Sequence, residues 1–443
     1  MTPPTFQLPK STVIEISKEK KEPKWMLDFR LRAMDIFNKK PLPAFGPSLE
    51  GLDSNKIHFY QKPIGKYSSW NEIPEDLRTI YKEIGVPEAD VNFLAGTGAQ
   101  YDSEIIFNSL KHEWESQGVI FTDIEHGLKE YPELFKQYFA TLVPPEDNKF
   151  AALNSALWSG GSFIYIPKGV KIRDPLQAYF RINTANLGQF ERTLIIADED
   201  SYLHYIEGCS APLYTDDALH AGVIEIFALK GARVRYTTIQ NWSKNVFNLT
   251  TQRMLIKEKG VGEWVDGNMG SRLTMKYPCI ILEGDQSRGE TLSLSFAEKG
   301  QIQDTGAKMI HLGKNTSSQI ISKSVSSRGG TSSFRSLIKV SPHAVGAKIS
   351  STCDTLILDG NSKSNTYPQN VICHPRAEID HEAKTSKLSQ DKLFYLLSRG
   401  VPEDTAKAML VNGFVEPIMK EIPFEYAVEL NRLINLSMEG SVG

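Results

Sequence analysis

The hydrophobic pattern of the chain changes from a helical period to a strand period and back again. In the segment 25–37, apolar side chains fall on one face of a helix. A second helix is predicted over 74–84, whereas 40–70 and 85–100 are rich in Pro, Gly and Asp and are predicted to be loops. Residues 1–150 are therefore predicted to form a mainly helical N-terminal domain.

From residue 151 to 385, short runs rich in Val, Ile, Thr, Tyr and Phe follow one another. In the segment 291–296, Leu and Phe alternate with Thr and Ser, which places one strand face in a core. Turn residues such as Gly300 and Gly313 recur at roughly 13–17-residue intervals, as in stacked β units. Long helical patterns are absent, which argues against a doubly wound α/β sheet. A β-sandwich and a β-solenoid both fit, and the steady spacing favours the solenoid.

The helical period returns over 386–443, which predicts a C-terminal helical domain. One helix is expected to end at Gly400, the next to run from Pro402 to Gly413, and a third to span 423–437. Two roles fit this domain, because a solenoid needs a cap at its end and a helical unit is also suited to docking a partner.

Composition excludes several classes of protein. The chain has 443 residues and a formal net charge of −3, so it has no basic field for nucleic acid. No apolar run approaches the roughly 20 residues of a membrane span, and the N-terminus lacks a signal-peptide pattern. We therefore expect a cytoplasmic protein without nucleic-acid or membrane partners. Its 4 cysteines include no CxxC pair, which argues against a disulfide framework and a zinc knuckle.

Familiar catalytic motifs are also missing from the sequence. There is no GxxxxGK[ST], GxSxG or HExxH pattern, so ATP hydrolysis in any associated process must come from another chain. The segment with the most potential ligands is 353–382, which contains Cys353, Cys373-His374 and the run Asp380, His381 and Glu382. These are ligand types that iron accepts. The alternative is a buried structural thiol and a solvated acidic strand end.

Two further features admit alternative readings. Cys209, in YIEGCSAP, is either a reactive thiol at a turn or a packed core residue, whereas Cys279 heads an apolar run and is expected to be structural. The polar stretches 181–183 and 240–242 are embedded in strand-like sequence. They either line an internal polar path or face solvent at the edges of the coils.

At these residues the chain resembles the SufB/SufD family of the SUF iron–sulfur assembly system. The matching stretches run in order through almost the whole chain: EPKWMLDFRLRA (22–33), LAGTGAQYDSE (94–104), NSALWSGGSFIYIPKGV (154–170), YFRINTANLGQFERTLIIADE (179–199), YIEGCSAP (205–212), ALHAGVIEIFAL (218–229), IQNW (239–242), DTGAKMIHLGKNTSSQIISK (304–323), DHEAKTSKLSQDKLFYLLSRG (380–400) and MLVNGF (409–414).

The resemblance implies a mainly β fold, with a right-handed parallel β-helix core between helical N- and C-terminal domains. It implies a non-enzymatic scaffold that carries a transient iron–sulfur cluster and receives sulfur from a donor protein. The implied partners are a SufC-type ABC ATPase on the C-terminal domain and a second SufB-like chain, in a homodimer or a SufD-type heterodimer. A reduced flavin is linked to the family's complex, and no motif in this sequence decides whether it binds here.

The resemblance also implies roles for single residues. Cys209 would receive sulfur as a persulfide, and Cys353 would accept it and bind the cluster together with His381 and Glu382. The family's internal sulfur path maps onto Arg181, Asn183, Gln240 and Trp242. Two positions depart from the family pattern: Gln252 stands where the family's path has a lysine, and Asp380 is one methylene shorter than the family's Glu.

Two other functions are alternatives to the scaffold. A β-helix enzyme acting on polysaccharide would usually be secreted and would need exposed acid and base groups along a groove. A SufD-like paralogue would dock the ATPase without carrying sulfur. The presence of both Cys209 and Cys353 favours a sulfur-handling scaffold.

Overall fold

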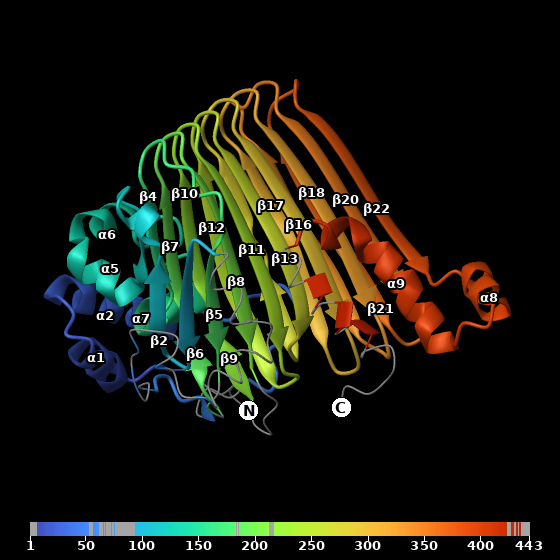
Figure 1. The fold of residues 1–443 in the computed structure, drawn as a ribbon, viewed down its shortest axis with the longest axis horizontal. Helices are drawn as coiled ribbons and strands as arrows, with labels where there is room; N and C mark the ends of the chain where they lie inside the picture. Colours follow the sequence, from blue (N-terminus) through green and yellow to red (C-terminus); the bar gives the residue numbers. More distant parts are fainter. Residues whose placement is uncertain are drawn as a thin grey trace.

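The computed structural model describes most of the chain and shows an elongated stack of β-coils with helices at both ends (Figure 1). The described residues are 7–52, 56–61, 65, 67, 72, 75, 94–182, 184, 186–211, 217–422, 427, 428, 431, 432, 434 and 435. Asn183, nearly all of the predicted helix over 74–84 and most of the one over 423–437 lie outside them. None of the helices in the described part of the chain is long and apolar enough to span a bilayer.

Two large sheets form the core, and nearly all of their neighbouring strands run parallel. Within the described residues, sheet I has ten strands in the order β2-β1-β5-β8-β11-β13-β16-β18-β20-β22. They span Glu104–Leu110, Gly96–Tyr101, Leu176–Arg181, Tyr202–Ser210, Arg233–Trp242, Val261–Gly270, Arg288–Ala297, Ser317–Ser326, Lys348–Ile357 and Glu378–Lys387, respectively.

Sheet II has twelve strands in the described residues, on the path β21-β19-β17-β14-β12-β10-β7-β4-β3. They span Lys363–Ile372, Thr331–Val340, Ile302–His311, Leu273–Lys276, Val246–Ile256, Val223–Ala228, Arg192–Ala197, Ser162–Ile166 and Ile120–Asp123. Beside this path lie β15 (Cys279–Leu282), which pairs with β12 and β17, β9 (Ala218–His220) and β6 (Gly188–Gln189).

The chain passes back and forth between the two sheets, so each coil contributes one strand to sheet I and either one strand or two short consecutive strands, such as β14 and β15, to sheet II. This arrangement confirms the predicted parallel β-helix core with flanking helices. The long strands of sheet I begin at residues 202, 233, 261, 288, 317, 348 and 378. Every coil contains two turns, one at each edge of the sheets. One coil is therefore as long as two of the turn-to-turn intervals that the sequence showed.

The turns that lead from sheet II to sheet I stack on one another. In the turns before β8, β11, β13, β16 and β18, one residue with positive φ donates its backbone N–H to a carbonyl of the next turn, as from Asp200 to Lys230 (2.9 Å) and from Asn315 to Val345 (2.7 Å). The five donors are Asp200, Gly231, Lys259, Gln286 and Asn315, and Gly346 in the turn before β20 is also left-handed. These bonds satisfy turn groups that the two sheets leave unpaired.

The inner face of sheet I is more polar than the alternating pattern suggested. In β16, the apolar residues Leu292, Leu294 and Phe296 face outward, where they join a cluster with residues of the C-terminal helix α9 (Glu403–Met419). The intervening Thr291, Ser293 and Ser295 therefore face the interior of the coils. The prediction that one face of this strand lies in a core is right, but that core lies outside the β-helix, beneath a helix.

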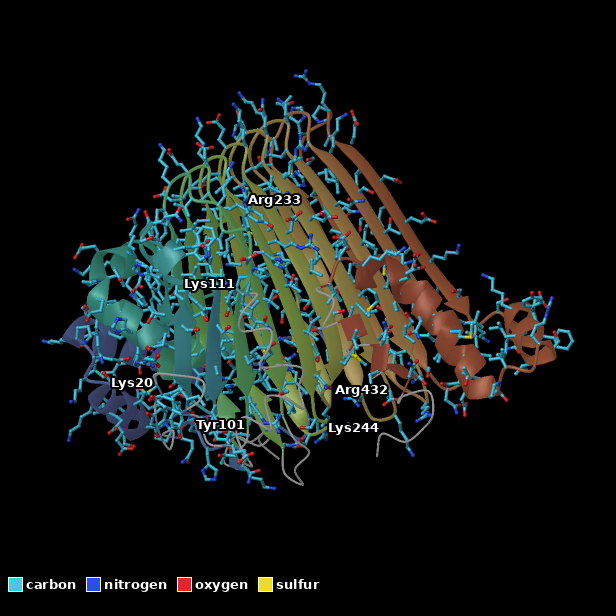
Figure 2. All side chains as sticks on the ribbon, in the orientation of Figure 1. Lys20, Tyr101, Lys111, Arg233, Lys244 and Arg432 are labelled. Atoms are coloured by element: carbon cyan, nitrogen blue, oxygen red, sulfur yellow. The ribbon has the colours of Figure 1, made fainter. Side chains whose placement is uncertain are left out.

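The N-terminal helices gather at one end of the stack (Figure 1). Among the described residues, the helices that precede β4 are α1 (Lys10–Glu19), α2 (Lys24–Lys39), α4 (His112–Glu115), α5 (Ile124–Glu130), α6 (Pro132–Tyr138) and α7 (Lys149–Leu157). Lys20, labelled in Figure 2, is 6% exposed and lies 2.5 Å from the Glu125 carboxylate. This ion pair joins the end of α1 to α5 beside the first coils.

The β-structure begins earlier than the sequence predicted. β1 starts at Gly96, within a segment expected to be a loop, and pairs in parallel with β5. Its sequence GTGAQY contains only one β-branched and one aromatic residue, Thr97 and Tyr101, and two of its six residues are glycines. A Cβ at Gly96 would lie 2.7 Å from the Ser109 carbonyl oxygen. Glycine is therefore required by close packing, although it weakens the strand signal.

Two C-terminal helices follow the last strand. α8 (Gln390–Ser398) begins after the N-cap Ser389, and α9 (Glu403–Met419) packs on the outer face of β16 and β18. The prediction that the second helix ends at Gly413 is wrong, because α9 continues for six residues beyond it. Burial of Val415, Ile418 and Met419 outweighs the roughly 1 kcal/mol cost of a glycine inside a helix.

A buried ion pair links the two sheets. Lys276 Nζ, on β14 of sheet II, lies 2.5 Å from Asp266 Oδ1, on β13 of sheet I, with side-chain exposures of 0% and 2%. Asn268 donates a second hydrogen bond to the Asp266 carboxylate at 3.0 Å. Removal of one partner leaves the other charge buried and uncompensated.

We therefore expect Lys276→Met to lower the free energy of unfolding by about 3–5 kcal/mol. The double variant Lys276→Met/Asp266→Asn should recover much of that loss, since no lone charge remains. Urea unfolding followed by circular dichroism measures both. The exposed Lys348–Glu378 pair is the control, and Lys348→Met should cost no more than about 1 kcal/mol. Equal small losses for Lys276→Met and Lys348→Met would contradict the interior role.

Candidate functional site

Three neighbouring rows of inward-facing residues run along sheet I, because its parallel strands pair in register. The Cys353 row contains Glu207, Thr238, Asp266, Ser293, Ser322, Cys353 and Ala383. The Cys209 row contains Phe180, Cys209, Gln240, Asn268, Ser295, Ser324, Thr355 and Thr385. The His381 row contains Tyr205, Tyr236, Trp264, Thr291, Ile320, Ser351 and His381.

The first two rows connect the two thiols singled out from the sequence. Cys209 and Cys353 lie on adjacent rows and are separated by five strand steps. At about 4.8 Å per step, the distance along the β-helix is roughly 24 Å. The residues between them are nearly all Ser, Thr, Asn, Gln and Asp, and these are at most 3% exposed. Of the two readings of Gln240, the internal position is the one observed.

Cys209 lies inside the β-helix and not at an accessible turn. It is 3% exposed, and its thiol donates a 3.6 Å hydrogen bond to Glu207 Oε1. Burial raises the pKa of the Cys209 thiol well above its ordinary value, and the nearby Glu207 and Glu191 carboxylates raise it further. The Lys276 ammonium acts in the opposite direction. The thiol is therefore protonated at neutral pH.

Glu207 is an ionisable carboxyl group in a dry environment. It is 1% exposed, and burial raises its pKa to about 7, with a further contribution from Glu191. Tyr236, Lys276 and His220 lower the pKa but do not cancel the effect of burial. The carboxyl group consequently changes its charge near neutral pH.

Sheet II contributes a hydrogen-bonded cluster that faces the Cys209 row. His220 contacts Glu191 through Nε2, and its Nδ1 lies 2.8 Å from Asn248 Oδ1. Asn248 and Trp242 both donate to Gln240 Oε1, at 2.5 and 3.3 Å, respectively. The rings of Trp242 and His220 lie 4.6 Å apart. Gln240 and Trp242 are therefore joined to each other and to a buried histidine.

Arg181 is the one described residue of the expected path that does not share the inner face. Its register partner is Ser210, the residue after Cys209, so its backbone position belongs to the opposite face. Its Nη1 lies 3.4 Å from Ser210 Oγ. Asn183, the other expected path residue of this segment, lies outside the described residues.

Cys353 lies one strand from the open end of sheet I and is 1% exposed. Burial raises the pKa of its thiol to about 12, whereas hydrogen bonds from Thr366 on β21 and Ser322 on β18 act to lower it. The thiol is thus enclosed by hydroxyl groups from both sheets. A bound cation or an approaching base is needed to form its thiolate.

His381 shares the inner face with Cys353, but Glu382 does not. His381 pairs in register with Ser351, which places its Cα diagonally opposite Cys353, at about 8 Å. Its Nε2 is buried without a hydrogen-bond partner among the described residues. Glu382 pairs with Thr352 on the outer face, together with Asp380 two residues earlier. In one chain the expected ligands therefore divide between two faces.

The described residues contain no group of three His, Cys, Asp or Glu side chains placed to hold a metal ion. Cys373, the alternative thiol, is exposed just beyond β21.

The last coil presents an open edge. β22 ends sheet I and β21 ends sheet II, and among the described residues no strand lies beyond either. Tyr367, Ile372 and Ile379 of this coil are exposed large hydrophobic residues. Figure 1 shows this edge at the end opposite the N-terminal helices, with α8 beside it. Within the described part of the chain, α8 and α9 therefore do not cap the coil.

Several residues of the interior cluster were missed from the sequence. Glu207 could have been found, because it lies two residues before Cys209 in a strand and so shares its face. Lys276, Glu191 and His220 come from other strands, and only the fold brings them together.

Comparison with known proteins agrees with this architecture. The family model described as SUF system FeS cluster assembly, SufBD core domain, matches residues 180–414, and that of the SufBD protein N-terminal region matches 17–178. The iron-sulfur cluster assembly protein SufB of Bacillus subtilis is 53% identical over 437 residues, covering 98% of this chain and 94% of that protein. An iron-sulfur cluster assembly SufBD family protein of Staphylococcus epidermidis is 54% identical over the same shares. The chain belongs to the SufBD family of the SUF iron–sulfur cluster assembly system.

Proposed function

We propose that this protein is a non-enzymatic scaffold for iron–sulfur cluster assembly that receives sulfur at Cys209 and uses it at Cys353. The observation that carries the proposal is the placement of both thiols on adjacent inner rows of sheet I, joined by buried polar side chains. The relatives support a role in cluster assembly through their names.

The interior suits the transfer of persulfide sulfur between thiols. Such sulfur moves by thiolate attack on a sulfur–sulfur bond, and solvent or small thiols would intercept it outside. The path also contains a cation, although Gln252 replaces the family's lysine. Lys276 is buried on the neighbouring strand and pairs with Asp266 of the Cys353 row. We propose that Lys276, paired with Asp266, supplies the positive charge that the family's lysine would provide at the position of Gln252.

The candidate ligands for iron lie at the open edge of the last coil. Cys353 and the unpartnered Nε2 of His381 face the interior there, and both are ligand types for iron. Glu382 and Asp380 lie on the outer face of an exposed edge strand. A second SufB-like chain, either a copy of this one or a SufD-type partner, would cover this edge. We propose that Glu382 becomes a ligand only in that assembly.

The C-terminal helices are proposed to dock the SufC-type ABC ATPase. Phe394 of α8 is 72% exposed, and Tyr395 and Met409 are also largely exposed. Large exposed hydrophobic groups on adjacent helices are typical of a protein interface. Because these helices leave the last coil open, docking explains them better than capping.

Replacement of each thiol by serine should abolish a different step of cluster assembly. Cys209→Ser should abolish loading from a protein sulfur donor but allow reconstitution with iron and free sulfide, since the cluster ligand Cys353 remains. Cys353→Ser should abolish cluster formation by either route. Anaerobic absorption spectra and acid-labile sulfide report the clusters, and mass spectrometry of intact protein reports the persulfide.

Cys279→Ser is the control, because Cys279 is a buried thiol of sheet II and has no place in the path. Its loading and cluster content should equal those of the wild type. Normal clusters in Cys353→Ser, or normal donor loading in Cys209→Ser, would overturn the proposed roles.

The docking surface makes a separate prediction. Phe394→Asp should weaken binding of the SufC-type ATPase by at least about tenfold, because the charge would be desolvated at the interface. Phe45→Asp is the control, since Phe45 is 53% exposed but lies in the N-terminal region. Isothermal titration calorimetry measures both affinities. Equal affinities for the wild type and Phe394→Asp would place the ATPase elsewhere.

A further inference from the structure

The buried carboxyl group beside Cys209 has a geometry suited to proton transfer. Glu207 and Cys209 lie two residues apart on β8, so both side chains face the interior. The thiol sulfur lies 3.6 Å from Glu207 Oε1, and the two residues are 3% and 1% exposed, respectively. We propose that Glu207 is the general base that takes the proton from Cys209 during sulfur transfer. This inference rests on the proposed role of Cys209 as the entry thiol.

The need for a base follows from the burial of the thiol. Thiolates are the nucleophiles in sulfur exchange, and burial together with neighbouring carboxylates makes this thiolate costly to form. Lys276 favours the thiolate electrostatically but, as an ammonium, cannot accept its proton. The carboxyl oxygen that already accepts the thiol's hydrogen bond is the acceptor in place.

The ionisation of the carboxyl group suits that task. A general base works best when its pKa lies near the working pH, and that of Glu207 is about 7. Its charge depends on the ionisable groups around it, which come from β8, β9, β11, β13, β14 and the segment before β7. They are Tyr205, Cys209, His220, Tyr236, Asp266, Lys276 and Glu191.

The proposed step is a balanced thiol–persulfide exchange. The Cys209 proton moves to the Glu207 carboxylate as the sulfur attacks the outer sulfur of a donor persulfide, R–S–SH. A new S–S bond forms on Cys209, the donor's S–S bond breaks, and the leaving thiolate takes the proton from Glu207. The overall change is Cys–SH plus R–S–SH to Cys–S–SH plus R–SH, with no external oxidant or reductant.

A purely structural role is a poor explanation for this residue. Glu207 has no ion pair among the residues that the structure describes, and a buried carboxyl group of this kind costs stability. An apolar residue of similar size would pack there at lower cost. The two accounts predict different pH profiles, because only a base must be ionised for sulfur transfer.

The test measures Cys209 persulfide formation in the full-length protein from pH 5.5 to 8.5, with glutathione persulfide as the donor and peptide mass spectrometry as the readout. The wild-type rate should fall about tenfold between pH 8 and pH 6, as the Glu207 carboxylate takes up its proton. Glu207→Gln should be slower by about 10²-fold at pH 7 and lose that inflection. Glu207→Asp should recover part of the rate.

Glu290→Gln is the matched control, because Glu290 is a carboxyl group of sheet I far from Cys209, and its profile should follow that of the wild type. Circular dichroism and the unfolding midpoint establish that each variant is folded. If folded Glu207→Gln has the wild-type rate and pH dependence, Glu207 is not the general base. Failure of the wild type itself to gain sulfur at Cys209, with other cysteines labelled, would instead overturn the proposed entry site and this inference with it.

Discussion

The in-register stacking of parallel strands is the constraint on which the rest of this structure depends. Because strands of one sheet repeat at a fixed spacing and face, residues from distant parts of the sequence form continuous rows. Cys209 and Cys353 are connected only through such rows, because five strand steps separate them. A slip of one residue in any strand between them would turn its polar side chains outward and its apolar ones inward.

The two faces of sheet I have different roles: the outer face packs against a helix, and the inner face carries polar and ionisable side chains. Sheet I buries leucine and phenylalanine on its outer face beneath α9, so hydrophobic packing there does not compete for the inner face. The interior retains Asp266 with Lys276, and His220 with Glu191, although buried charges are rarely the most stable solution. Such pairs also oppose register slips, since a displaced coil would leave each charge alone.

Much of the fold could be predicted from the sequence, and less of the site. The strand pattern, the turn spacing and both thiols were visible, because alternation and turn chemistry are local. Which face of β16 points inward was not visible, since helix α9 provides a second apolar environment outside the coil. β1 escaped detection because close packing requires glycine there. The separation of His381 from Glu382 follows from strand alternation, but the open edge beside them is a property of the whole stack.

The exposed last coil has a consequence for the behaviour of the free chain at high concentration. β21 and β22 are each 10 residues long and end their sheets without a neighbour in the described structure. Unpaired N–H and C=O groups on long edge strands act as templates for other chains, and apolar residues such as Ile372 and Ile379 add adhesion. Chains in which this edge is uncovered are thus expected to aggregate as their concentration rises. Self-association at raised concentration is therefore the physical consequence of a stack whose last described strands have no neighbour.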